Sequence, residues 1–252
     1  MKLDHPTAQE IPGLRVLWKT AFGDTNDFLD QFFSTAYSPE RCLCATEDDQ
    51  VCAALYWLNA SCRERKFAYI YAVATDPARR GRGLCRRLMD AARKRLQQQG
   101  YAGALLVPVS ESLIQMYSRM GYSPCTTVSE FRCFAALPAA PIQKLDAAAY
   151  ARSRRQLLPE GSVLQEGESL AFLETQASFY AGPGFLAVTA MDGEDFHCLE
   201  LLGDTSAAPR LLSALDAKQG FFRCPGGDKP FAMFQPLTDD CPKPSYFGFA
   251  FD

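Results

Sequence analysis

Residues 65–98 join three features that few folds allow side by side: a strand, a glycine turn and a basic helix. The segment RKFAYIYAVATD, residues 65–76, is rich in aromatic and β-branched residues and is predicted to form a strand. It runs directly into a loop in which Gly81 and Gly83 alternate with arginines. Apolar residues at helical spacing then mark one face of a helix that ends at Gly100: Leu84, Leu88, Ala92 and Leu96.

The loop between this strand and this helix is suited to bind an anion. First-turn amides of a helix have no intrahelical partner, and the helix dipole places partial positive charge there. Gly81 and Gly83 lack a Cβ, so a phosphate can approach the backbone. Four arginines add attraction: Arg80, Arg82, Arg86 and Arg87. The loop therefore predicts a phosphate or pyrophosphate site, with a solvated basic helix as the alternative.

Two common phosphate-binding motifs are excluded. The pattern GxxxxGK[ST] of a P-loop is absent. Arg86 stands where a dinucleotide-binding fingerprint needs its third glycine.

The remaining pattern predicts two successive α/β modules. In the first module, helices within residues 11–40 precede two strands within 41–61. The basic helix is followed by a strand at 103–109, a short helix at 112–121 capped by Ser112, and a strand at 126–137. The stretch ALPAAP resembles a linker, so we expect domains at 1–135 and 136–252. The second half repeats the order strand, strand, helix, strand, strand without a sequence repeat. Its strands are expected near residues 185–191, 196–203, 220–224, 231–237 and 246–251. Its helices are expected at 146–158, 168–180 and 208–217.

Composition excludes several classes of protein. A hydrophobic share of 48% supports a folded core, and a net charge of −3 argues against a general nucleic-acid binder. Ten cysteines without a CxxC pair, and only two histidines, predict no metal site. The N-terminus lacks the apolar core of a secretory signal and no run of 18 apolar residues occurs, so we expect a cytoplasmic protein without a membrane partner.

Two segments, taken in order, resemble the GCN5-related N-acetyltransferase (GNAT) family. YAVATDPARRGRGLCRRLM is similar to the family's acyl-CoA-binding core, with Arg80 to Cys85 in place of the pattern Q/R-x-x-G-x-G/A. Cys85 departs from that pattern at its last position, where its small side chain leaves the amide unchanged. ESLIQMYSRMGY resembles the family's lYeklGF segment and puts Tyr117 in the place of the catalytic tyrosine. The resemblance covers roughly Leu14 to Phe134.

This resemblance implies an α/β (α+β) fold, with a mixed, mostly antiparallel sheet flanked by helices, and transfer of an acetyl group from acetyl-CoA to a primary amine. Tyr117 would protonate or hold the leaving sulfur. The backbone from Val73 to Thr75 would pair with the pantetheine arm and stabilise the oxyanion. The implied cofactor-binding residues are Val73, Ala74, Thr75, Arg80, Gly81, Arg82, Gly83, Leu84, Cys85 and Arg86.

The second half is expected to be a degenerate GNAT-like module, because its corresponding turn, TSAAP, lacks glycine and arginine. This arrangement resembles that of the Eis-type acetyltransferases, in which the C-terminal carboxylate reaches the active site. By that resemblance the Asp252 end would supply a general base; Tyr69, Tyr71, Glu111 and water are the other candidates.

Several alternatives stay open. The chain could be a non-catalytic acyl-CoA sensor, a nucleic-acid binder through its arginines, or an enzyme that forms an acyl intermediate on Cys85, whose thiol at a helix N-terminus could have a lowered pKa. The sequence does not identify the amine or say whether the protein is a homo-oligomer.

Overall fold

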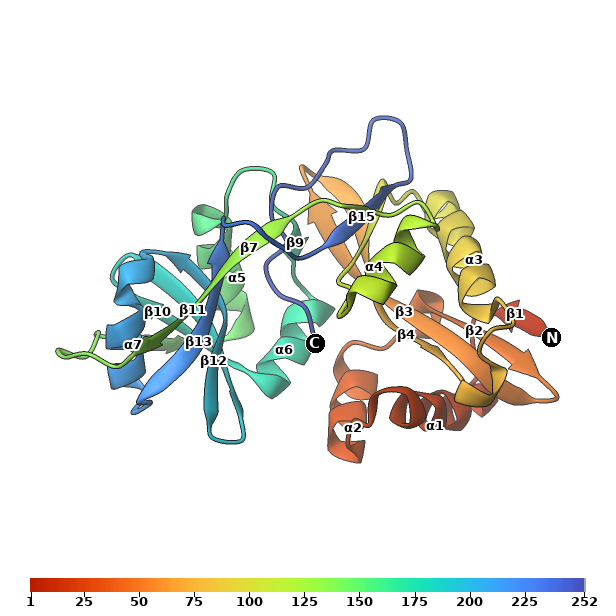
Figure 1. The fold of residues 1–252 in the computed structure, drawn as a ribbon, viewed down its shortest axis with the longest axis horizontal. Coiled ribbons are helices and arrows are strands. Elements are labelled where there is room, and N and C mark those ends of the chain that lie inside the picture. The colour runs from red at the N-terminus through yellow and green to blue at the C-terminus, as the bar shows by residue number, and fades with distance from the viewer. Residues whose placement is uncertain (252) are drawn as a thin grey trace. The chain divides into compact units, whose positions relative to one another are not determined.

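The computed structural model describes residues 1–251, which form two compact units (Figure 1). Unit 1 consists of Met1–Ser123 and Met233–Pro242. Unit 2 consists of Pro124–Ala232 and the residues from 243 onward. Each unit has its own sheet and its own core, so each is described by itself.

Unit 1 has one mixed sheet whose order is β1-β2-β3-β4-β5-β15-β6. Neighbouring strands from β1 to β4 are antiparallel, β4 and β5 are parallel, and β5 pairs antiparallel with β15. The elements are β1 (Lys2–Asp4), α1 (Ile11–Phe22), α2 (Asn26–Thr35), β2 (Cys42–Glu47), β3 (Gln50–Cys62), β4 (Arg65–Thr75), α3 (Leu84–Gln98), β5 (Gly103–Leu106), α4 (Glu111–Ser118), β6 (Ser123–Pro124) and β15 (Met233–Pro236).

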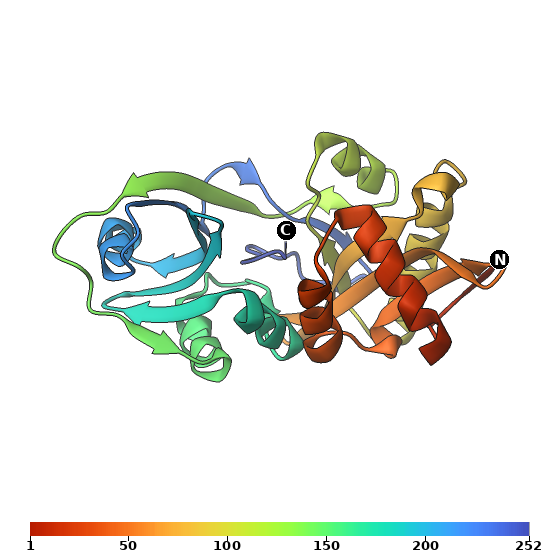
Figure 2. The same ribbon diagram turned by 90° about the horizontal axis from the view of Figure 1, so that it is seen from below.

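Helices cover both faces of this sheet (Figures 1 and 2). On one face, Trp18 of α1 and Phe32 of α2 pack against Tyr56 and Tyr71 of the central strands. On the other, the apolar stripe of α3 joins Trp57 and other strand residues in one core cluster. The helix pattern at 84–96 therefore predicts the buried side of α3 correctly: Leu84, Leu88, Ala92 and Leu96 are all buried.

Unit 2 also has one mixed sheet, in the order β14-β7-β13-β12-β11-β10-β8. Its neighbouring strands are antiparallel except for the parallel pair β12–β13. The elements are β7 (Thr127–Phe134), β8 (Gln143–Leu145), α5 (Ala147–Leu157), β9 (Leu164–Gln165), α6 (Glu168–Gln176), β10 (Ser178–Gly182), β11 (Phe185–Asp192), β12 (Asp195–Gly203), α7 (Ala208–Ala214), β13 (Gln219–Pro225) and β14 (Lys229–Pro230).

The helices of unit 2 pack on opposite faces of its sheet. Tyr150 of α5 stacks on Phe179, which lies opposite Val188 in the register. The preceding residue of β11, Ala187, belongs to the core cluster that contains α7 residues. Successive strand residues point to opposite faces, so α5 and α7 cover different faces. This confirms the predicted α/β class for both units.

The two sheets share one topology. In each, a strand is followed by a helix and then by a parallel neighbour: β4-α3-β5 in unit 1 and β12-α7-β13 in unit 2. The next strand in each sheet comes from elsewhere in the chain, because β5 pairs with β15 and β13 pairs with β7. The chain therefore passes between the units after residues 123, 232 and 242.

This exchange of strands differs from the sequence prediction. We expected residues 126–137 to close the first module and residues 231–237 to belong to the second, with a boundary after residue 135. Instead β7 lies in the sheet of unit 2 and β15 in that of unit 1. A strand pattern predicts extended backbone but not the partner, which depends on residues far away in the chain.

Three local predictions are wrong. The cap of α4 is Ser110, whose hydroxyl accepts a hydrogen bond from Leu113 N at 3.3 Å, and not Ser112. The helix expected at 168–180 ends at Gln176, and β10 follows it. Residues 246–251 form no strand; this segment instead bonds to a residue far away in the chain, with Phe249 O accepting from Gln165 Nε2 at 2.7 Å. Within residues 1–251, no helix combines the length and the apolar character that a membrane crossing requires.

Candidate active site

Strand β4 carries the first part of the predicted site, because it separates from its neighbour β5 before it ends. The register between the two strands stops at Tyr69 opposite Leu105, whereas β4 continues to Thr75. A bulge opposite Leu55 places Ala72 at φ 48°, which locally changes the direction of the strand. The end of β4, which contains the predicted residues 73–75, thus extends past β5 towards the loop.

The loop that follows opens the N-terminus of α3. Gly81 and Gly83 both adopt positive φ, at 77° and 73°, where a Cβ would strain the backbone. Gly83 is the N-cap of α3 and has no side chain with which to cap the first-turn amides. Ser110 does cap α4 in this way. The predicted loop therefore has the conformation and exposure that an anion site at a helix N-terminus requires.

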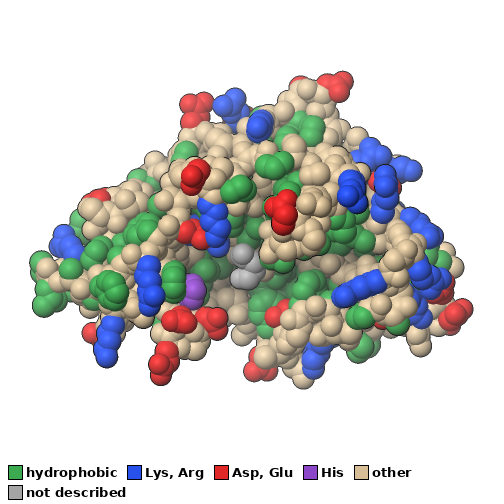
Figure 3. Space-filling view, in the orientation of Figure 1, with side chains coloured by type: hydrophobic (Ala, Val, Ile, Leu, Met, Phe, Trp, Pro, Cys, Tyr) green, Lys and Arg blue, Asp and Glu red, His purple; other side chains and the backbone are tan. Residues whose placement is uncertain are grey.

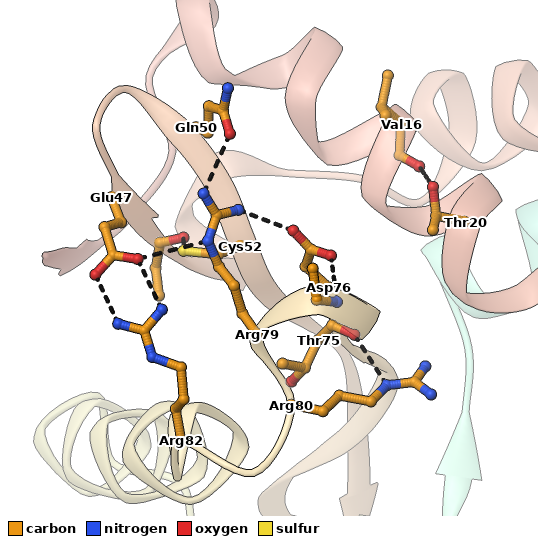
Figure 4. Close-up of polar contacts among 12 residues, drawn as sticks. Val16, Thr20, Glu47, Gln50, Cys52, Thr75, Asp76, Arg79, Arg80 and Arg82 are labelled. Carbon is orange, nitrogen blue, oxygen red and sulfur yellow. Dashed lines mark hydrogen bonds and ion pairs between the residues drawn. The ribbon is translucent and has the colours of Figure 1, made fainter.

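Acidic and polar groups from earlier in the chain hold the arginines of the loop in place (Figure 4). Arg82 forms two hydrogen bonds with the Glu47 carboxylate, at 3.0 and 3.1 Å. The pKa of Glu47 is held below its ordinary value, first by the hydrogen bond from Arg82. Arg79 binds Asp76 and Gln50, and Arg80 Nε lies 3.4 Å from Thr75 O. Glu47, Gln50 and Asp76 were not predicted from the sequence: Glu47 and Gln50 lie outside the motif, and Asp76 precedes the Arg80–Cys85 pattern.

Basic side chains gather over the surface at α3. In the space-filling view, Lys and Arg side chains cluster over the area where α3 lies in Figure 1 (Figure 3). Arg80, Arg82, Arg86 and Arg87 are exposed. This local positive surface, on a chain of net charge −3, favours an anionic ligand at the start of α3.

Tyr117 lies in the same hydrophobic cluster as the first turn of α3. It is 7% exposed, and it belongs to one cluster with Leu84, against which Val73 and Cys85 pack. Burial raises the pKa of Tyr117 well above the ordinary value of a phenol. The structure thus brings together the strand end, the loop and the tyrosine, which are separated in sequence.

The other candidates differ in their surroundings. Burial raises the pKa of the Cys85 thiol, opposite to the lowering that a nucleophile at a helix N-terminus would need. Tyr69 and Tyr71 lie 5.9 Å apart between ring centroids on β4, and Tyr71 contacts Trp18 on the α1 face. Glu111 is exposed in the first turn of α4. Asp252 lies outside the described residues.

In the part of the chain that the structure describes, no three His, Cys, Asp or Glu side chains are grouped so as to hold a metal ion. The ten cysteines are free thiols.

Solved structures with the same fold include proteins described as acetyltransferases. A GCN5-related N-acetyltransferase from Kribbella flavida superposes with a TM-score of 0.70 at 17% identity, over 92% of this chain and 70% of that one. Eis1 from Mycobacterium abscessus gives 0.67 at 13% identity, over 94% and 74%. A putative acetyltransferase from Pyrococcus horikoshii gives 0.62 at 10% identity, over 99% and 95%. At these identities the likeness concerns the fold.

Sequence comparison identifies the family. No curated protein matches the chain. A family model described as an acetyltransferase (GNAT) domain matches residues 2–125, a range that contains the strand end, the glycine loop and Tyr117. Residues 2–125 of this chain therefore belong to the GCN5-related N-acetyltransferase family.

Proposed function

We propose that the protein transfers an acetyl group from acetyl-CoA to a primary amine. The observation that supports this most is the end of β4, which extends past β5 beside the uncapped, arginine-rich N-terminus of α3. In a GNAT domain, this pair of features offers unpaired main-chain groups to an extended ligand and main-chain donors to its phosphates.

The loop would bind the diphosphate of the CoA moiety. The amides from Gly81 to Arg86 would donate to its oxygens, and the exposed arginines would attract it from solution. The main chain from Val73 to Thr75 would pair with the pantetheine arm and direct the thioester towards Tyr117. Leu84 and Cys85 would contribute through their amides, since both side chains pack into or against the core.

The reaction would be a direct transfer. The neutral amine attacks the thioester carbonyl and a tetrahedral intermediate forms, whose oxyanion accepts hydrogen bonds from the backbone near residues 73–75. The C–S bond then breaks, the acetyl group stays on nitrogen, and the CoA sulfur leaves as a thiolate. Tyr117 gives that thiolate a proton or a hydrogen bond, while the amine loses its own proton to a base or to water.

The environment of Tyr117 keeps its hydroxyl protonated. Because burial raises its pKa, the hydroxyl holds its proton throughout the neutral range. It can therefore donate a hydrogen bond to the sulfur as negative charge develops there.

Removing this hydroxyl should lower the rate of chemistry without lowering the affinity for the cofactor. Tyr117→Phe is expected to reduce kcat by about 100-fold, the scale of one general acid. The affinity for CoA should stay within about twofold. The measurement is acetyl-CoA turnover over a panel of amines, with calorimetry of CoA binding on the same samples.

Tyr122→Phe is the matched control, because its ring lies 6.0 Å from that of Tyr117 and it is equally buried. An unchanged kcat in Tyr117→Phe would remove the tyrosine from the mechanism. CoA binding without turnover of any amine by the unmodified protein would favour the acyl-CoA sensor.

We further propose that unit 2 is a degenerate GNAT-like module in an Eis-like tandem. Its sheet has the same order as that of unit 1, including the parallel pair around a helix. Both units have a short 3-10 helix after the first strand of this pair, Pro77–Arg79 in unit 1 and Thr205–Ala207 in unit 2. In unit 2, however, it leads directly into α7 with no glycine–arginine loop between them. Without open amides and arginines, this turn would not bind a second CoA, so we expect one CoA per chain.

A further inference from the structure

Arg79 stands immediately before the predicted CoA-binding residues, but its guanidinium is already bound by the protein itself. Nη1 donates to the Asp76 carboxylate at 2.8 Å, and Nη2 donates to Gln50 Oε1 at 3.1 Å. Nε lies 3.5 Å from Glu47 Oε2. The side chain is 19% exposed, which is less than the 53% of Arg82.

These contacts connect the start of the loop to the turn between β2 and β3 (Figure 4). Glu47 ends β2 and Gln50 begins β3, on either side of that turn, whereas Asp76 is the first residue after β4. Asp76 is fixed twice more: its N–H donates to Cys52 O at 2.9 Å, and its carboxylate accepts from Ala78 N at 3.0 Å. Arg79 thus fixes the chain just before it enters Gly81.

We propose that Arg79 is a positioning residue, which holds the loop in the conformation that exposes its amides and does not itself contact phosphate. This inference rests on the proposed function. A loop that is already ordered loses less conformational entropy when it binds a ligand, so its affinity is higher. Glu47 has the complementary role, because its carboxylate holds both Arg79 and Arg82.

The test is calorimetric binding of CoA to the full chain, for Arg79→Ala, Arg79→Lys and the control Lys94→Ala. Lys94 is an exposed cation further along α3, so its removal changes the net charge equally. We expect Arg79→Ala to raise the Kd about tenfold. Arg79→Lys should recover little of this loss, since an ammonium lacks the planar fork that reaches three acceptors.

Salt distinguishes positioning from phosphate contact. The loss in Arg79→Ala should be the same at about 0.05 M and about 0.5 M salt, whereas a loss of long-range attraction is screened at the higher concentration. Turnover should show a higher KM for acetyl-CoA with kcat unchanged. In the double variant Glu47→Ala, Arg79→Ala, the loss should be well below the sum of the single losses, because the two residues form one network.

Two results would overturn the inference: a Kd for Arg79→Ala equal to that of Lys94→Ala, or a loss that disappears at high salt. The fluorescence of Trp18 and Trp57 on heating identifies any variant whose unit 1 has unfolded. Arg79→Lys then gives the decisive comparison. If the unmodified protein bound no CoA at all, the proposed function would fail instead.

Discussion

A fragment of residues 1–135 is expected not to fold, although it contains the whole matched GNAT domain. It lacks β15, which pairs with β5 through four residues from Met233 to Pro236. Met233 and Phe234 are buried, and Phe234 stacks on Phe67 at 5.9 Å. Losing two such side chains costs about 3–6 kcal/mol, of the order of a domain's whole stability. The fragment would also leave β5 as an apolar edge and β7 without a partner.

A rearranged fragment should fold. Cys125 N donates to Ala232 O at 3.0 Å, so the chain can be closed between these residues by a short loop of about four residues. We expect residues 1–125 joined in this way to residues 232–242 to give a soluble domain with cooperative thermal unfolding. Circular dichroism and amide hydrogen exchange compare the two fragments. Cooperative unfolding of 1–135 alone would show that β15 is dispensable.

Glu200→Ala should strongly lower the free energy of unfolding of unit 2. Glu200 is fully buried, and its carboxylate accepts from Arg154 at 2.7 and 2.8 Å. The hydroxyls of Tyr150 and Tyr246 donate to the same carboxylate. An arginine cannot lose its proton to avoid a buried, unpaired charge. We therefore expect a loss of about 3–5 kcal/mol in the free energy of unfolding of unit 2.

The neighbouring arginine of the same helix provides the control. Arg155 pairs with Glu166 at the surface, with its side chain 60% exposed, so Glu166→Ala should cost under about 1 kcal/mol. Urea unfolding followed by circular dichroism gives the stabilities, and hydrogen exchange of β12 amides assigns the change to unit 2. Both tryptophans lie in unit 1, so their fluorescence should change little. Equal losses in the two variants would mean that water reaches Arg154.

This buried cluster also explains why residues 246–251 are ordered without forming a strand. Arg154 lies over the Phe249 ring at 4.9 Å, and Tyr246 donates to Glu200. A Cβ on Gly248 would lie 1.9 Å from Glu200 Oε1, so glycine is needed there. The aromatic pattern of this segment resembles a strand, but its buried side chains bind a charged cluster and not a sheet edge.

The sequence alone determined those features that depend on neighbours in the chain. The apolar stripe of α3, the extended run of β4 and the glycine turn between them are local, because periodicity and positive φ are properties of a few consecutive residues. Tyr117 was singled out by the resemblance of one short segment to the GNAT family, and its catalytic role stays a prediction.

Only the tertiary structure decided which segments meet. The partner of β5 comes from residues 233–236, and two of the groups that hold Arg79 come from the facing ends of β2 and β3, which no loop motif includes. The ion pair between Arg154 and Glu200 joins residues 46 positions apart. Strand pairing and buried charge pairs are stable only when the rest of the core excludes water around them, and that condition is a property of the whole fold.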